Sequence, residues 1–399
     1  MKKNAIQIQV ARRIERLPAY LFGQINHAKM TKRQAGADVI DLGMGNPTDP
    51  TPAPVVEKLR EAVMDPRNHR YSVSIGVPNL RLEAAKLYQR YWGVKLDPEK
   101  EIVACLGSKE GFSHMCLALL GSGDTAIAPA PAFPIHVHSA AMTGANVIRI
   151  PIAPDSLYLS KLSEIARQMT PCPKVAILNY PHNPTTRTVE LDFFKEVVRI
   201  CRRYNIMILQ DLAYGVTTFD GYRAPSILQV KGAKDIAVEF FTLSKGWNMA
   251  GWRIGFALGN KQMIAALGRV KGYYDYGIFQ AIQIAAIIAM RTCDGYVANQ
   301  AKIYELRRDL LCQQLTRIGW PVKRPKASMF VWVPVPKKFR KMGSMNVALK
   351  LLDEANVAVA PGIGFGDEGE NYLRVALVEN EQRLAQAIRQ WGRATRGWS

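Results

Sequence analysis

The sequence predicts an α/β protein with a large, largely parallel sheet covered by helices on both faces and a smaller α+β domain. From residue 102 to 259, short β-rich runs alternate with amphipathic helical stretches, which is typical of parallel strands joined by helices. After about residue 293 the pattern changes to a long charged helix followed by separate strands and helices. The chain has 399 residues, which is long for a single hydrophobic core, so two domains are expected.

The N-terminal part begins with an arm that carries Tyr20. The elements predicted after it are a helix (21–34), a short strand (39–42) and a second helix (55–64). The stretch 43–47, Gly-Met-Gly-Asn-Pro, predicts a tight turn, where glycines allow a ligand to approach the backbone or simply permit the bend. A polar loop with one aromatic side chain, Tyr71, follows the second helix.

Six β-rich runs are predicted as strands in the middle of the chain. They end at Leu106, Pro129, Tyr180, Leu212, Ser244 and Gly259. Among the helices between them, residues 191–204 carry apolar residues at helical spacing. Ligands of such sheets bind beyond the carboxyl ends of the strands, so the side chains that follow these runs are the candidates for a site.

The C-terminal part predicts the smaller α+β domain. Its expected elements are a helix (299–318), a strand (329–333), a helix (347–354), strands (357–360 and 372–378) and a terminal helix. The most apolar helix candidate, residues 278–290, precedes this part. It is too short to span a bilayer and contains Gln280 and Gln283, so no membrane contact is expected.

The chain is strongly basic, with a formal net charge of +20 and an isoelectric point near 9.7. Such a charge indicates contact with nucleic acid or an anionic membrane, or a basic surface that steers anionic substrates or maintains solubility. We favour the second interpretation, because Lys and Arg are spread along helical stretches and no nucleic-acid-binding motif is present. The cluster at residues 337–341 is expected to be a solvated loop.

The cysteine pattern bears on the compartment. The six cysteines are scattered without a CxxC pair: Cys105, Cys116, Cys172, Cys201, Cys293 and Cys312. This favours a reducing compartment and buried thiols over disulfides or zinc. No apolar signal core follows Met1-Lys2-Lys3-Asn4. A cytoplasmic protein without a metal site is therefore expected.

One lysine stands at the end of a predicted buried strand. The apolar run 236–243 ends abruptly in Ser244-Lys245-Gly246. A lysine placed there can be stripped of water, lose its proton near neutral pH and form a Schiff base with an aldehyde. Most lysines are solvated, however, so Lys245 taken alone is better interpreted as a surface residue. The remaining motifs decide between these alternatives.

Two motifs after other strands offer an anion site and an aromatic ring. Residues 107–111, Gly-Ser-Lys-Glu-Gly, open a helix whose free N–H groups and dipole attract anions. Ser108 adds a hydroxyl donor there, or serves only as a helix cap. Phe133 follows the next strand and can stack on a flat heteroaromatic ring. Simple core packing is the better interpretation of Phe133 alone.

Two further strand ends carry polar side chains. Asn183, in a turn after the strand ending at Tyr180, can aim its amide at a ligand or merely form an Asn-Pro turn. Asp211 ends an apolar strand, where a carboxylate is costly unless a partner satisfies it. A protonated pyridine nitrogen is such a partner, and Tyr214 can supply a phenol to the same ring. A helix cap is the structural alternative for Asp211.

The last candidate is Arg374, inside an apolar strand of the small domain. A buried arginine needs a carboxylate, which the protein or a substrate can provide. Together the motifs supply a ring stacker, an aspartate for a ring nitrogen, an amide and a phenol for a ring hydroxyl, and an anion site. A Schiff-base lysine and a carboxylate-binding arginine complete the set. This inventory matches pyridoxal phosphate (PLP) together with an amino acid.

The order and spacing of these motifs resemble the fold type I, class I/II aminotransferases over nearly the whole chain. The resemblance is carried by Tyr71-Ser72 with Gly76 and by residues 107–111, 182–185, 211–214, 242–245, 248–253 and 361–366. Residues 45–47, 238–242 and 326–332 are most similar to bacterial alanine-forming (glutamate–pyruvate) transaminases, near the LL-diaminopimelate aminotransferase branch. The family fold implies a seven-stranded sheet in a large PLP-binding domain (49–292). Residues 293–399 would form the small domain, and 1–48 an arm and part of that domain.

The resemblance also implies roles for individual residues. Lys245 would hold PLP as an internal aldimine and shuttle a proton, Asp211 would keep the pyridine nitrogen protonated, and Tyr214 with Asn183 would bind the ring oxygen. Phe133 would stack on the ring. The phosphate would be held by Ser108, Lys109, Thr242 or Ser244, Arg253 and, from the other subunit of a homodimer, Tyr71. The substrate would be bound by Arg374 at its α-carboxylate, by Gly45 and Asn183, and by Tyr20 in the covering arm.

The implied activity is exchange of an amino group between an L-amino acid and a 2-oxo acid, with alanine/pyruvate and glutamate/2-oxoglutarate as the expected pairs. Specificity for LL-diaminopimelate, aspartate or aromatic substrates remains an alternative, as does a PLP-dependent C–S lyase or decarboxylase. Three positions depart from the common pattern: Phe133, Thr186 and Gly246-Trp247. The last is expected to alter substrate contacts. A non-catalytic binding protein is disfavoured, because the lysine, the aspartate and the arginines are intact.

Overall fold

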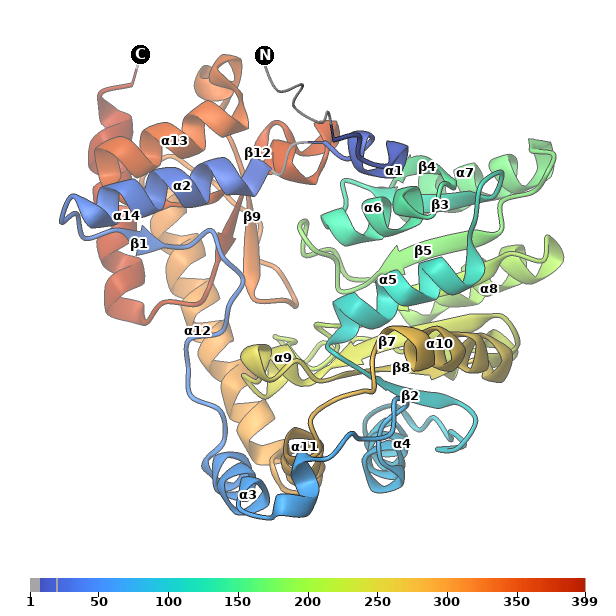
Figure 1. The fold of residues 1–399 in the computed structure, drawn as a ribbon. Coiled ribbons are helices and arrows are strands. Elements are labelled where there is room, and N and C mark those ends of the chain that lie inside the picture. Colours follow the sequence, from blue (N-terminus) through green and yellow to red (C-terminus); the bar gives the residue numbers. More distant parts are fainter. Residues whose placement is uncertain (1–7, 19–20, 399) are drawn as a thin grey trace, which may run out of the picture.

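The computed structural model describes residues 8–18 and 21–398 of the chain. Its largest sheet has seven strands in the order β2-β8-β7-β6-β5-β3-β4 (Figure 1). Their bounds are β2 (Ile102–Cys105), β3 (Thr125–Ala130), β4 (Asn146–Pro151), β5 (Val175–Asn179), β6 (Met207–Asp211), β7 (Ala237–Thr242) and β8 (Gly255–Gly259). The predicted α/β fold with a mostly parallel seven-stranded sheet is therefore confirmed.

Strand β8 is the exception to the parallel arrangement, because it runs antiparallel to both neighbours, β7 and β2. Its first residue, Gly255, lies beside Thr242, the last residue of β7. The segment that precedes β8 therefore lies at the same edge of the sheet as the carboxyl ends of the parallel strands. This reversal brings Arg253 to the edge where the other candidate side chains follow their strands.

The edge strand β4 was not among the predicted strands. Only Ile150 of its six residues is buried, and the others are partly or fully exposed. An edge strand of this kind lacks the continuous apolar run that marks a strand buried on both faces. The predicted strand at residues 357–360 also differs, because it is divided between β10 (Val357–Ala358) and β11 (Ala360–Pro361), which belong to different sheets.

Helices cover both faces of the large sheet. One face packs against α5 (Ser108–Leu119), α6 (Pro134–Met142) and α10 (Lys261–Tyr274), which contribute Phe112, Ala140 and Leu267 to one core cluster. The other face packs against α4 (Pro78–Trp92), α7 (Asp155–Gln168), α8 (Leu191–Arg203) and α11 (Gln280–Thr292). The short α9 (Leu243–Gly246) follows β7 directly, so Lys245 is fixed one turn beyond a fully buried strand.

A second group of elements forms its own core beside the large sheet. It contains an antiparallel sheet, β11-β12-β9, with β9 (Phe330–Pro334) and β12 (Tyr372–Ala376), and a parallel pair of β1 (Ile40–Asp41) with β10. The helices are α2 (Leu21–Gln34), α12 (Asp294–Arg317), α13 (Gly343–Ala355) and α14 (Glu381–Arg396). Figure 1 shows the N-terminal α2 lying beside the C-terminal α13.

The cores indicate how the chain is shared between the two lobes. Ile25, Ile40 and Leu42 of the N-terminal region belong to the same cluster as Leu311 and Leu373 of the C-terminal region. This packing is compatible with the division at residues 48 and 292, and those boundaries stay a prediction. The remaining α-helices of the described residues are α1 (Arg12–Glu15) and α3 (Ala53–Val63).

Three smaller expectations can be compared with the structure. The six cysteines are free thiols, and all but the partly exposed Cys172 are buried. Residues 337–342 form a 3-10 helix with a buried Phe339, instead of a wholly solvated loop. Among the described residues, no single helix is long and apolar enough to cross a membrane, although α11 and α12, bent by 79° at their junction, pass that test as a pair by length and composition.

Candidate active site

A cavity of about 670 Å³ lies at the carboxyl edge of the large sheet, between the two lobes. Twelve of the predicted site residues line it: Gly45, Ser108, Lys109, Phe133, Asn183, Asp211, Tyr214, Thr242, Ser244, Lys245, Arg253 and Arg374. Tyr71 does not line the cavity, and its side chain is 86% exposed. The prediction for Tyr20 falls outside the described residues.

Lys245 projects into this cavity from the short helix α9. Its Nζ donates a hydrogen bond to the carbonyl oxygen of Gly45 at 2.6 Å. Burial, together with the positive charges of Arg374 and Arg253, lowers the pKa of Lys245 to about 8. The amine is therefore neutral in an appreciable minority of molecules near physiological pH, and this neutral form is the nucleophile. The interpretation of Lys245 as a solvated surface residue is wrong.

Gly45 is constrained by its neighbours. A Cβ atom at this position would lie 2.4 Å from Cζ of Phe330, so a larger residue would displace the ring. Phe330 in turn packs edge-to-face against Tyr214, with the ring centroids 5.7 Å apart. Burial raises the pKa of Tyr214, which keeps its phenol protonated and able to donate a hydrogen bond. The small residue in the turn thus lets the backbone carbonyl approach Lys245.

Asp211 is oriented by His136, a residue not predicted from the sequence. Nε2 of His136, a fully buried side chain on α6, lies 2.9 Å from Oδ2 of Asp211. The backbone N–H of Ala213 donates to the other carboxylate oxygen at 3.1 Å. The carboxylate is therefore fixed on both oxygens while it lines the cavity. The only sequence signal for His136 is its place three residues after Phe133, which does not distinguish it from a structural histidine.

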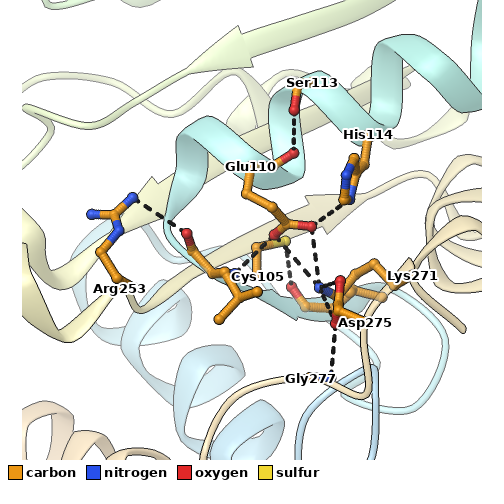
Figure 2. Close-up of polar contacts among 10 residues, drawn as sticks. Cys105, Glu110, Ser113, His114, Arg253, Lys271, Asp275 and Gly277 are labelled. Atoms are coloured by element: carbon orange, nitrogen blue, oxygen red, sulfur yellow. Dashed lines mark hydrogen bonds and ion pairs between the residues drawn. The ribbon is translucent and has the colours of Figure 1, made fainter.

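A candidate anion site lies where β8 meets the start of α5. Arg253 has a left-handed backbone (φ 55°), and its Nη2 donates to the carbonyl oxygen of Leu106 at 3.3 Å (Figure 2). Gly107 has φ +81°, and a Cβ there would lie 2.3 Å from Nη2 of Arg253. A Cβ on Gly255 would lie 2.6 Å from the backbone nitrogen of Ser108. Both glycines permit the close packing of a guanidinium group against the N-terminus of a helix.

The hydroxyl groups of β7 and α9 extend this anion site. Thr242 caps α9: its Oγ1 accepts a hydrogen bond from the backbone N–H of Ser244 at 3.1 Å and lies 3.0 Å from the carbonyl oxygen of Ile254. Oγ of Ser244 is 2.9 Å from the same Oγ1. Two hydroxyl groups, a guanidinium group and the first turn of α5 therefore surround one end of the cavity.

The other end of the cavity holds Arg374 in a fixed orientation. Its Nη1 donates to Oδ1 of Asn183 at 2.8 Å, and its Nη2 donates to the carbonyl oxygen of Gly43 at 3.0 Å. The guanidinium carbon lies 4.0 Å from the ring centroid of Phe330 and 4.8 Å from that of Phe365. Aromatic contacts of this kind stabilise the cation and restrict its motion. Arg374 is therefore preorganised to receive a planar carboxylate.

Phe133 and Lys109 lie on the wall between the two ends. Nζ of Lys109 is 5.8 Å from the ring centroid of Phe133. The neighbouring His182 is buried, its Nδ1 lies 2.8 Å from Oγ1 of Thr185, and burial lowers its pKa to about 3. A histidine that stays neutral and is held in a turn supports a structural role for His182.

The chain is similar to known proteins over nearly its whole length. The sequence profile "Aminotransferase class I and II" matches residues 37–390. Glutamate-pyruvate aminotransferase AlaC of Escherichia coli (strain K12) is 48% identical over 377 residues, which are 94% of this chain and 92% of that protein. LL-diaminopimelate aminotransferase 2 of Nostoc sp. is 40% identical over 382 residues, covering 96% and 97%. A solved aminotransferase from Staphylococcus aureus has a TM-score of 0.88 at 28% identity, covering 98% and 100%.

The α/β fold brings a lysine of lowered pKa, a carboxylate fixed on both oxygens and a candidate anion site together in one cavity. The chain belongs to the class I and II aminotransferase family. It is an aminotransferase that acts on amino acids and 2-oxo acids, and its family uses PLP.

The residues present in the cavity fit that cofactor. The cradle at Gly107, Ser108 and Arg253 offers cationic and N–H donors to a phosphate group. Asp211 offers a carboxylate fixed on both oxygens. Lys245 lies in the same cavity with a lowered pKa. A phosphate, a ring cation and an aldehyde are the groups that such a donor set binds.

Proposed function

We propose that the protein exchanges an amino group between alanine/pyruvate and glutamate/2-oxoglutarate in a ping-pong reaction. The observation that carries the proposal is the presence of Lys245, Asp211 and Arg374 in one cavity. The similarity to a glutamate-pyruvate aminotransferase at 48% identity supports the choice of substrates. The 40% identity to an LL-diaminopimelate aminotransferase keeps that specificity as the main alternative.

The proposed cofactor contacts follow from the chemistry of each side chain. Asp211 would hold the protonated ring nitrogen, Asn183 and Tyr214 the ring oxygen, and Phe133 one face of the ring. Ser108, Lys109, Thr242 or Ser244, and Arg253 would hold the phosphate. When bound, PLP supplies an electron sink, which accepts the electron pair left at the substrate's α-carbon when its proton is removed.

Lys245 is proposed to bind the cofactor covalently and to move the proton at the substrate's α-carbon. A pKa of about 8 suits its Nζ both to accept and to return a proton near neutral pH. The carbonyl oxygen of Gly45, 2.6 Å away, directs one N–H bond and so orients the nitrogen lone pair. The buried strand β7 behind Lys245 keeps the amine at a fixed depth in the cavity.

Arg374 is proposed to bind the substrate's α-carboxylate in a bidentate manner. Asn183 and the carbonyl of Gly43 already orient the guanidinium group, so little conformational entropy is lost when the substrate arrives. Gly45 and Tyr20 are proposed to lie near the bound substrate, and the Tyr20 assignment rests on the family resemblance alone.

The proposed assembly is a cytoplasmic homodimer in which Tyr71 reaches the phosphate site of the partner subunit. The 86% exposure of Tyr71 supports this assignment. Its ring packs on the ring of Tyr276, with the two centroids 4.9 Å apart. Tyr273 and Tyr274, which precede Tyr276 in the sequence, are also exposed. Exposed aromatic groups of this kind are typical of protein–protein contacts. The free, mostly buried thiols support a reducing compartment.

Product analysis with a substrate panel tests the proposed reaction. We expect stoichiometric formation of pyruvate and glutamate from alanine and 2-oxoglutarate, with little turnover of LL-diaminopimelate, aspartate or aromatic amino acids. Preferred turnover of LL-diaminopimelate would replace the substrate assignment. Pyruvate with ammonia and no amino transfer would instead indicate a lyase.

Sedimentation analysis tests the proposed dimer. A purely monomeric enzyme with full activity would contradict it.

A further inference from the structure

Behind the anion site, a largely buried ion-pair cluster connects two helices, α5 and α10, and the loop that follows α10. The side chain of Lys271, on α10, is fully buried, and its Nζ lies 3.3 Å from Oε1 of Glu110 and 3.1 Å from Oδ2 of Asp275. Nδ1 of His114 lies 2.5 Å from Oε1 of Glu110. Figure 2 shows these side chains meeting beneath the first turn of α5.

The cluster bears directly on the turn that begins the anion site. Oε2 of Glu110 accepts a hydrogen bond from the backbone N–H of Leu106 at 2.8 Å. The carbonyl oxygen of Leu106 accepts from Arg253, and Gly107 and Ser108 follow at once. Glu110 therefore bridges Lys271 on one side and the turn of residues 106–108 on the other.

The cluster also reaches the segment that carries Tyr71. Oδ1 of Asp275 accepts a hydrogen bond from the backbone N–H of Gly277 at 2.7 Å. Gly277 has φ +85°, and a Cβ there would lie 2.6 Å from the carbonyl oxygen of Val73. The ring of Tyr276 packs on that of Tyr71. Lys271 thus stands between the anion site of its own subunit and the loop proposed to reach the partner subunit.

A metal site is one alternative function for this cluster. Glu110, His114 and Asp275 present ligand atoms within 4.8 Å of one another, as a metal site would. The ammonium group of Lys271 already lies between two of these carboxylates and supplies their counter-charge. Burial opposes that charge, but Cys105, Glu110 and Asp275 raise the pKa of Lys271 overall. A purely structural ion pair is the other alternative, and it differs from a positioning role because its loss would leave the relative affinity for PLP and pyridoxal unchanged.

We propose that Lys271 is a positioning residue for the cofactor's phosphate: through Glu110 it holds the turn of residues 106–108, and with it Ser108 and Arg253, in the geometry that binds the anion. This inference rests on the proposed phosphate contacts. It implies that loss of Lys271 weakens binding of the phosphate group specifically, and not binding of the pyridine ring. Removal of such an outer partner typically reduces affinity or activity at metal sites about 10- to 100-fold, and a loss of at least about tenfold is expected here.

The experiment compares binding of PLP with binding of pyridoxal, which has the same ring and no phosphate. Apo-enzyme is titrated with each compound. The Kd for pyridoxal divided by the Kd for PLP, called the Kd ratio, measures the contribution of the phosphate group. Lys271→Met is expected to reduce this ratio about tenfold or more, whereas Lys271→Arg restores most of it. The phosphorus NMR shift of bound PLP is expected to change in Lys271→Met and to return in Lys271→Arg.

A matched control comes from the other lobe. Arg308, on α12, is equally buried and paired with Asp220 at 2.6 Å and Asp309 at 2.8 Å. Arg308→Met is expected to lower the unfolding temperature while leaving the Kd ratio unchanged. If Lys271→Met does not fold, Glu110→Gln provides the second variant, because it removes the charge and keeps the side chain's shape. A wild-type Kd ratio and phosphorus shift in Lys271→Met, or in Glu110→Gln if Lys271→Met does not fold, would overturn the proposal.

Ser108→Ala separates failure of this inference from failure of the proposed cofactor contacts. If Ser108→Ala reduces the ratio and Lys271→Met does not, the phosphate assignment stands and the role of Lys271 is wrong. If neither variant changes the ratio, the phosphate site itself is misassigned, and the positioning role is overturned with it.

Discussion

Gly107 offers a sharp test of the anion site, because a single methyl group there would meet the guanidinium of Arg253. A Cβ at position 107 would lie 2.3 Å from Nη2 of Arg253. The obstructed atom is at the end of a flexible side chain, so we expect Gly107→Ala to displace the guanidinium group and not the backbone. The hydrogen bond from Arg253 to the carbonyl oxygen of Leu106, at 3.3 Å, would then be lost.

The size of the effect follows from two separate contributions. The backbone of Gly107, with φ +81° and ψ 156°, is unfavourable for alanine and costs about 1–3 kcal/mol of folding stability. Loss of a hydrogen bond to a charged phosphate costs about 1.5–3 kcal/mol of binding free energy. The second contribution corresponds to a PLP Kd raised about 10- to 150-fold.

Gly93 provides the matched control, because only the backbone contribution applies to it. Its φ is +68°, and a Cβ there would meet nothing within 4 Å. Gly93→Ala is therefore expected to lower stability by about 1–2 kcal/mol and to bind PLP as the wild type does. Denaturant unfolding and PLP titration of both variants measure the two contributions. A wild-type Kd in Gly107→Ala, or equal weakening in Gly93→Ala, would refute the assignment of the cradle.

Three further predictions follow from the site and the core. Arg374→Ala is expected to raise KM for both amino and oxo acids, with about 2–5 kcal/mol lost in kcat/KM; an unchanged KM in steady-state kinetics would argue against its carboxylate role. His136→Phe removes the partner 2.9 Å from Asp211 and is expected to weaken PLP binding about tenfold or more; an unaltered titration would contradict this. Burial raises the pKa of Glu239 from 4.5 to about 7, so its contribution to stability is full below about pH 4.5 and is lost by about pH 7, on the order of 3 kcal/mol. The free energy of unfolding, measured with denaturant, is therefore expected to fall between pH 4.5 and 8, and Glu239→Gln is expected to reduce this fall. An unchanged pH dependence in the variant would exclude Glu239 as its source.

The sequence was most informative where an apolar strand ends in a polar side chain. Asp211 and Lys245 could be identified because each follows a run that is buried on both faces, and parallel strands bring such ends to one edge. Arg253 could not be placed in this way, since its position depends on the antiparallel direction of β8. That direction is set by pairing with β7 and β2, which local periodicity does not reveal.

The residues that support the site were harder to predict than those that line it. His136 and Lys271 each lie on a helix packed against the sheet, where a lone polar residue resembles an ordinary core histidine or a surface lysine. Their partners, Asp211 and Glu110, are distant in sequence or on another helix. Such contacts depend on tertiary packing, so only the folded structure brings them together. The same limit applies to the edge strand β4, because its exposed residues do not form the continuous apolar run from which a buried strand is predicted.

The absorbance spectrum of the purified protein reports both on the binding of PLP to Lys245 and on the alanine–glutamate reaction. We expect the purified protein to show a visible cofactor band that is lost, together with turnover, in Lys245→Ala. Alanine, and separately glutamate, should convert the wild-type band to the near-ultraviolet form of the aminated cofactor. A band that responds to glutamate but not to alanine would remove the alanine assignment. No band after reconstitution with PLP, or appreciable turnover by Lys245→Ala, would contradict the assignment of Lys245 as the PLP-binding residue.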